Sequence, residues 1–147
     1  MKGNIFHSFS KNIVFLEDYA FLIQALLDLN DTTMNIKYKL KAQELSKKTL
    51  ELFYLKEKKI FQKNKILDND IFIAPIDISD NTTPNGNTIM LLNLTRLGML
   101  DQASELASSL NGYLNKYKIF MASSIKAVDF FNEIKSGKKC GDQGCQI

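Results

Sequence analysis

A chain of 147 residues is long enough for one domain with a buried core, and its apolar content of 45% and charged content of 24% are ordinary for a globular protein. The net charge of +3 comes from lysines spread along helix-like segments, which is typical of solvated helix faces and argues against a nucleic-acid partner. The longest apolar run, residues 19–29, is interrupted by Gln24 and Asp28 and is too short for a bilayer, which needs about 20 residues. No signal-like apolar segment follows residues 1–4, so we expect a cytoplasmic protein with no membrane partner.

The first half of the chain predicts two helices of different character after a mixed lead-in at residues 1–14. Residues 16–29 are apolar nearly all round, which is typical of a helix buried on most sides. Residues 30–33 are polar and predict a break that caps the next helix. Residues 34–55 carry one narrow apolar stripe, which indicates an amphipathic helix with a wet side.

A β-hairpin and a polar loop are expected next. Ile60–Phe61 and residues 71–73 are short β-prone runs, with an Asp-Asn-Asp segment at residues 68–70 between them. The following loop, residues 76–83, carries Asp77 and Asp80.

Three further helices are predicted in the second half. Thr83 is the expected N-cap of the third helix and Pro84 suits its first turn, where a missing N–H costs nothing. Residues 89–97 are largely apolar, and Gly98 is the expected terminator. Residues 101–117 form an amphipathic pattern and residues 119–134 are apolar-rich again.

The order of helices indicates the architecture. Buried and amphipathic helices alternate, which favours an inner and an outer layer over a simple up-and-down bundle. We therefore expect an all-α fold, a partial α/α toroid of about five helices with one β-hairpin insertion. We expect residues 1–135 to form its single domain and residues 136–147 to form a flexible tail that contains cysteines. A part-toroid exposes apolar edges, so self-association or a separate segment that completes the ring is expected.

Several motifs in order resemble one family. Residues 16–20, Leu-Glu-Asp-Tyr-Ala, resemble the Leu-Asp-Asp-Tyr-Ala motif of the YyaL-type thioredoxin-domain-containing proteins, relatives of the spermatogenesis-associated thioredoxin-like proteins. Residues 6–9 resemble a His-containing strand upstream of that motif, and residues 75–88 resemble a stretch that ends in Pro-Ser-Gly-Asn-Ser. Cys140 and Cys145 match a Cys-x4-Cys pair near the C-terminus of the family.

The resemblance implies the last part of a larger protein. Members look like an N-terminal thioredoxin-like domain followed by an (α/α)6 toroid, similar to those of N-acylglucosamine 2-epimerases and six-hairpin glycosidases. This chain departs from the pattern at four positions: Glu17 replaces Asp, Ala74 replaces Arg, Ile76 replaces Lys and Asn85 replaces Ser. Two cations beside two carboxylates are therefore missing, which argues against an anionic ligand.

Two pairs of acidic residues are candidates for chemistry. Asp18 and Glu17 act either as an acid/base or sugar-hydroxyl-binding pair at the mouth of the toroid, or as first-turn acids that interact with the helix dipole. Asp77 and Asp80 either bind a ligand or a metal, or form Asx turns and caps in their own loop. A catalytic role is assigned to Asp18 and Asp80, with Tyr19 expected beside them in the site.

The remaining candidates are a helix start, one histidine and two cysteines. Gly86 and Asn87 open a helix whose N–H groups suit a polar ligand, or they form a tight turn in which Asn87 holds loop carbonyls. His7 is either a general base or a structural residue, and a single histidine makes no His-rich metal site. Cys140 and Cys145 form a disulfide, a redox pair or half a metal site, or remain free thiols, the default in a reducing cytosol.

Two functions are consistent with these patterns, and no cofactor is expected with either. The first is a fragment of a carbohydrate-active or carbohydrate-binding toroid, not catalytic alone, with a carbohydrate ligand near Asp18 and Asp80. The second is a non-catalytic structural or interaction module, or a split-gene relict, accessory to a thioredoxin-like redox domain.

Overall fold

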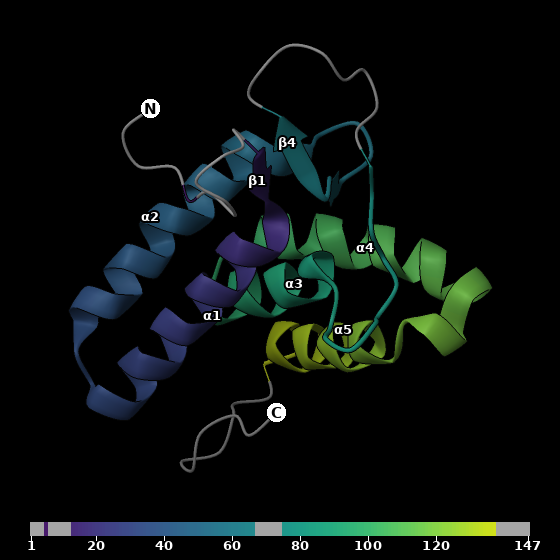
Figure 1. The fold of residues 1–147 in the computed structure, drawn as a ribbon. Helices are drawn as coiled ribbons and strands as arrows, with labels where there is room; N and C mark the ends of the chain where they lie inside the picture. Colours follow the sequence, from purple (N-terminus) through teal and green to yellow (C-terminus); the bar gives the residue numbers. More distant parts are fainter. Residues whose placement is uncertain (1–4, 6–12, 67–74, 138–147) are drawn as a thin grey trace.

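The computed structural model describes residue 5 and residues 13–66 and 75–137, and these ranges fold into an all-α protein with a small β-hairpin insertion (Figure 1). Its helices are α1 (Leu16–Thr33), α2 (Ile36–Phe53), α3 (Gly86–Arg96), α4 (Leu100–Tyr117) and α5 (Ala122–Lys135), with a 3-10 turn η1 (Lys118–Phe120) before α5. The short strands are β1 (Ile13–Phe15), β2 (Tyr54–Leu55), β3 (Ile60–Phe61) and β4 (Asn64–Ile66). No helix in these ranges is long and apolar enough to cross a membrane.

The first helix runs further than predicted. The polar residues expected to break it remain helical, and the hydroxyls of Thr32 and Thr33 donate to the carbonyls four residues earlier, at 2.8 and 2.6 Å. The helix ends at Met34, which adopts a left-handed conformation with φ of 55°. Asn35 then caps α2, since its side-chain oxygen accepts the backbone N–H of Lys37 at 3.2 Å.

The predicted hairpin is confirmed for one of its strands. β3 coincides with the expected strand Ile60–Phe61, and it pairs antiparallel with the preceding β2, joining Tyr54 to Phe61 and Leu55 to Ile60. The other expected strand, residues 71–73, lies outside the described residues. A second antiparallel pair, β1 with β4, holds the start of α1, where the Leu16 N–H donates to the Lys63 carbonyl at 2.8 Å.

α3 is the centre of the fold. Every residue of α3 from Gly86 to Thr95 is buried, because α1 packs on one side of it and α5 on the other (Figure 1). α2 covers α1, and α4 covers α3 and α5. Two polar contacts fix the inner helices to one another: Asn93 donates to the Ala20 carbonyl at 2.8 Å, and the hydroxyls of Thr88 and Ser124 share a hydrogen bond of 2.6 Å.

α1 and α5, which flank α3 in the inner layer, are more exposed to solvent than their sequences predict. α1 buries one stripe but leaves Phe21, Leu22 and Leu29 exposed, and α5 leaves Ile125 exposed. Each packs against α3 on one side only, whereas α3 has a helix on both sides. The expected apolar edges therefore exist in the described part of the chain.

Both ends of α3 are set by local polar geometry. Gly98, with φ of 74°, follows the helix as predicted, and its N–H donates to the Thr95 carbonyl at 3.1 Å. The predicted start is wrong by two residues: the N-cap is Asn85, whose side-chain oxygen accepts the Thr88 N–H at 3.0 Å. Pro84 therefore precedes the helix, and so does Thr83.

Candidate functional site

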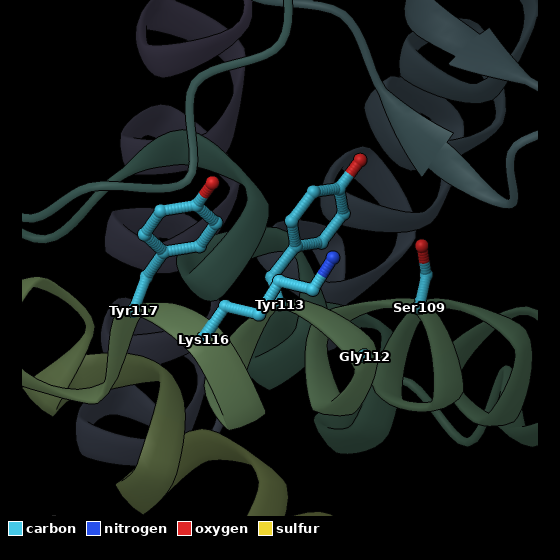
Figure 2. Close-up of a pocket in the computed structure, with 5 residues that line it drawn as sticks. All are labelled: Ser109, Gly112, Tyr113, Lys116 and Tyr117. Carbon is cyan, nitrogen blue, oxygen red and sulfur yellow. The ribbon is translucent and has the colours of Figure 1, made fainter.

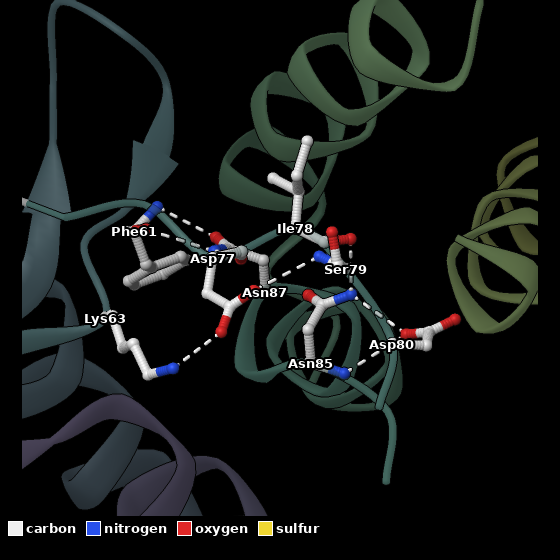
Figure 3. A network of polar contacts seen from close by, with 8 residues as sticks. All are labelled: Phe61, Lys63, Asp77, Ile78, Ser79, Asp80, Asn85 and Asn87. Atoms are coloured by element: carbon white, nitrogen blue, oxygen red, sulfur yellow. Dashed lines mark hydrogen bonds and ion pairs between the residues drawn. The ribbon is translucent and has the colours of Figure 1, made fainter. Parts of the chain in front are cut away.

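The inner helices α1, α3 and α5 begin close together, and the loop of residues 75–85 connects their first turns. Figure 3 shows the polar network of this loop, in which the carboxamide of Asn85 points toward the carboxylate of Asp80 and the carboxylate of Asp77 points toward Lys63. Most of the residues predicted to form a site meet here, and the contacts of each one show what its side chain does.

Gly86 allows the starts of α1 and α3 to touch. A Cβ atom at this position would lie 2.9 Å from Cγ and Cδ2 of Leu16 and 3.5 Å from the backbone nitrogen of Glu17. Real Cβ contacts are essentially never that short, so the glycine is explained by helix packing. The presence of Gly86 is therefore explained without the ligand-binding role that the sequence predicted for it.

Asp80 joins the start of α3 to the start of α5. Its Oδ1 accepts the backbone N–H of Asn85 at 3.2 Å, the Asn85 carboxamide at 3.1 Å and the Ser123 hydroxyl at 2.5 Å. Its Oδ2 accepts the Ser123 N–H at 2.8 Å, in the first turn of α5. Both oxygens are therefore occupied, and the carboxylate also lies at a helix N-terminus, where negative charge is favourable.

Asp77 combines an Asx turn with an ion pair. One oxygen accepts the Ser79 N–H at 3.2 Å, and the other lies 2.7 Å from the ammonium of Lys63 (Figure 3). The hydrogen bond to Asp77 holds the pKa of Lys63 above its usual range. The capping and turn roles that the sequence left open for Asp77 and Asp80 are thus present in the structure.

Asn87 is wholly buried and links three segments of the chain. Its side-chain oxygen accepts the Phe61 N–H at 2.9 Å, and its amide donates to the carbonyls of Phe61 and Asp77, both at 3.0 Å. This is the structural alternative considered from the sequence, in which Asn87 holds loop carbonyls, and it leaves neither side-chain atom for a ligand.

Glu17 and Asp18 lie at the first turn of α1, beside this network. Burial raises the pKa of the Glu17 carboxyl above its ordinary value, and the nearby negative charges of Asp77 and Asp18 add to that effect, while Lys63 opposes it. Asp18 is half-buried and is held by interactions of its own. A half-buried carboxyl that resists ionisation, next to a second carboxyl, is the part of this region that most resembles an acid/base pair.

Tyr19 is a core residue in this structure. Its side chain is 0% exposed, its ring meets that of Phe53 edge-on at 5.5 Å, and its hydroxyl accepts the Ile5 N–H at 2.9 Å. The predicted ligand contact therefore has no access from solvent in the described part of the chain. The sequence already indicated that Tyr19 is a core residue, because it lies on the apolar stripe of α1 that includes Ile23.

The other predicted site residues, His7, Cys140 and Cys145, lie outside the described residues, so their roles stay predictions. Among the residues that the structure does describe, no group of three His, Cys, Asp or Glu side chains is arranged to hold a metal ion.

A pocket that the sequence analysis missed lies on α4. It encloses about 230 Å³ and is lined by Ser109, Gly112, Tyr113, Lys116 and Tyr117. Figure 2 shows the rings of Tyr113 and Tyr117 side by side on one face of the helix, with both hydroxyls directed away from it. Four-residue spacing of two tyrosines after a glycine was the available signal, and it was masked by the apolar stripe of the same helix.

Comparison with known proteins gives one informative similarity. The chain is similar to Uncharacterized protein B0495.5 of Caenorhabditis elegans, with 39% identity over 83 residues, which are 56% of this chain. Those residues are 11% of the relative, so the chain corresponds to a small part of that protein's length. No protein-family model matches the chain.

Proposed function

We propose that this chain is a non-catalytic structural and interaction module of the α/α-toroid type. The observation that supports this best is the use of the polar side chains at the helix starts. Asp80 takes four hydrogen bonds from Asn85 and Ser123, and the carboxamide of Asn87 is fully used within the fold. These groups join the starts of α3 and α5 to the loop and to β3, and they are occupied before any ligand arrives.

The test separates a structural role from a ligand-binding role for Asp80. Asp80→Asn keeps the size of the side chain and weakens its acceptance of hydrogen bonds, so the free energy of unfolding falls without any ligand present. Titration calorimetry with neutral and acidic mono- and oligosaccharides should give no saturable binding to the unmodified chain. Saturable sugar binding that Asp80→Asn abolishes, with unchanged unfolding, would overturn the proposal.

A carbohydrate ligand at Glu17 and Asp18 is the second candidate function. The two adjacent carboxyls in the first turn of α1 support it, since sugar chemistry uses a pair of carboxyls, and burial raises the pKa of Glu17. Under this proposal, Asp18→Asn and Glu17→Gln weaken binding of a sugar in the same titration, while Asp101→Asn, an exposed acid of α4, does not. Equal binding by all of these variants would remove Glu17 and Asp18 from the site.

A role beside a thioredoxin-like redox domain is proposed from the sequence motifs alone. It places the protein in the cytoplasm and gives Cys140 and Cys145 a redox or free-thiol state. Thiol titration of the native protein without reductant tests the disulfide, because two reactive thiols would exclude it.

A further inference from the structure

Four exposed side chains form an apolar surface on α1, called here the α1 face: Phe21, Leu22, Ala25 and Leu29. The spacing of these residues places them on one side of the helix. Phe21 is 36% exposed, Leu22 40% and Leu29 44%. An exposed apolar stripe along a helix marks an interaction surface more often than a solvated one.

The surroundings of the α1 face are acidic. α1 carries Glu17, Asp18, Asp28 and Asp31, and residues 16–33 contain no lysine or arginine. Arg96 of α3 pairs with Asp28 and Asp31 at 2.7 and 2.8 Å. Lys39 acts on Asp31 and Lys63 acts on Glu17, so three cations offset most of the charge of the four acids. A small negative balance remains.

A second apolar surface lies where α4 passes through η1 into α5, and it is called here the η1 corner: Tyr117, Ile119, Phe120 and Ile125. Ile119 is 89% exposed and Phe120 60%. The corner is held in place from within, because the Phe120 carbonyl accepts the Asp80 N–H at 2.7 Å and the neighbouring Met121 is 0% exposed. The apolar side chains are therefore presented on a fixed turn.

The charge around the η1 corner is opposite to that around the α1 face. Lys116, Lys118 and Lys126 are exposed there, and the sequence contains no aspartate or glutamate between Glu105 and Asp129. The half-buried carboxylate of Asp80, which is hydrogen bonded to Ser123, offsets one of these three positive charges. The pocket formed by Tyr113 and Tyr117 lies next to the corner on α4 (Figure 2) and provides a recess beside the protruding side chains.

We propose that the η1 corner of one copy of this chain binds the α1 face of a second copy. The apolar side chains of the two surfaces cover one another, and the lysines of the corner face the carboxylates of α1. The proposal rests on the interaction role proposed above and names the partner of that role. Because two different surfaces meet, the contact is head-to-tail, so each copy keeps one surface available for a further copy.

One variant of each surface separates this contact from a symmetric one. Leu22→Lys places a cation in the α1 face, and Ile119→Glu places an anion in the η1 corner. Leu100→Lys is the matched control, since Leu100 is an exposed leucine of α4 at 39%, close to the 40% of Leu22, and belongs to neither surface.

Sedimentation velocity over a range of micromolar concentrations measures the result. The unmodified chain and the Leu100→Lys control should show a mass that rises with concentration, and the rise should weaken as salt approaches about 0.5 M, where the Debye length is a few ångströms. Each surface variant alone should remain a monomer. An equal mixture of the two surface variants should form a dimer and nothing larger, because only one intact α1 face and one intact corner can meet.

Three results would overturn the proposal. They are a monomeric unmodified chain at every concentration, self-association of Ile119→Glu equal to that of the unmodified chain, and a mixture of the two surface variants that stays monomeric. Circular dichroism of every variant verifies that the fold is kept. None of these results touches the role of Asp80 in the loop, which is measured by unfolding and sugar titration.

Discussion

Asp80 contacts both the start of α3 and the η1 corner, and the side chains of these two regions lie in opposite environments. At α3, the carboxamides of Asn85 and Asn87 are buried and the carboxylate of Asp80 is half-buried, and each forms hydrogen bonds within the fold. At the corner, the backbone N–H of the same Asp80 fixes a turn whose apolar side chains project into solvent. The comparison shows that polar residues here organise the interior, and that the surface features suited to binding a partner are apolar.

Removing the carboxamide of Asn87 should cause the largest loss of stability, because it removes buried polar contacts at the start of α3. Asn87→Ala leaves the Phe61 N–H and the carbonyls of Phe61 and Asp77 without their partner in a buried place, so the free energy of unfolding should fall by about 3 kcal/mol. Urea denaturation followed by circular dichroism measures it. Asn111→Ala on the exposed face of α4 is the control, and an equal loss in both variants would contradict the assigned role.

Enlarging Gly86 should have the next largest effect. In Gly86→Ala the added Cβ meets Leu16 at 2.9 Å, and the leucine side chain must move within the core, so we expect a loss of about 1–3 kcal/mol. Gly112→Ala is a matched control, since a Cβ there meets nothing within 4 Å. Gly112→Ala should even be slightly stabilising, because alanine favours the helix. Equal stability of the two variants would show that the helix starts can separate without cost.

Weakening the Asp80 carboxylate should be less severe. Asp80→Asn retains one acceptor oxygen for the donors at Asn85 and Ser123, so a loss of about 1–2 kcal/mol is expected in thermal unfolding. Asp80→Ala, which removes both oxygens, should lose more. An Asp80→Ala variant as stable as the unmodified chain would show that the caps of α3 and α5 do not depend on this residue.

Much of the fold follows from local pattern, whereas the site does not. Helix periodicity, the terminator Gly98 and the strand Ile60–Phe61 depend on neighbours in the sequence, and each was predictable. The N-cap of α3, which is Asn85 and not Thr83, could not be predicted, because it depends on the position of Asp80 in the folded loop. Likewise, Asn87 bonds Phe61 26 residues away and Asp80 bonds Ser123 43 residues away, so a single sequence leaves their roles open.

The protonation of Glu17 gives a smaller effect that depends on pH. Burial raises its pKa above the ordinary 4.5, so the folded protein binds this proton more tightly than the unfolded chain does. Its favourable contribution is fully present below pH 4.5 and is lost as the pH rises through the folded pKa. Glu17→Gln should therefore be more stable than the unmodified chain at neutral pH, by less than about 1 kcal/mol because the group is partly solvated. Below pH 4 the two should converge, and a Glu17→Gln variant that is less stable at neutral pH would contradict the sign.

The smallest effect on stability is expected at the η1 corner itself. Ile119 is 89% exposed, so Ile119→Ser should change the free energy of unfolding by no more than about 0.5 kcal/mol. Two residues later, Met121 is 0% exposed, and Met121→Ser should lose several times as much, because it removes a buried side chain and adds a hydroxyl. Measured together by urea denaturation at a concentration too low for self-association, this pair tests whether the turn separates interior from surface within two residues. A large loss from Ile119→Ser would mean that the isoleucine is covered in the isolated chain, and the corner would then not be available to bind a second copy.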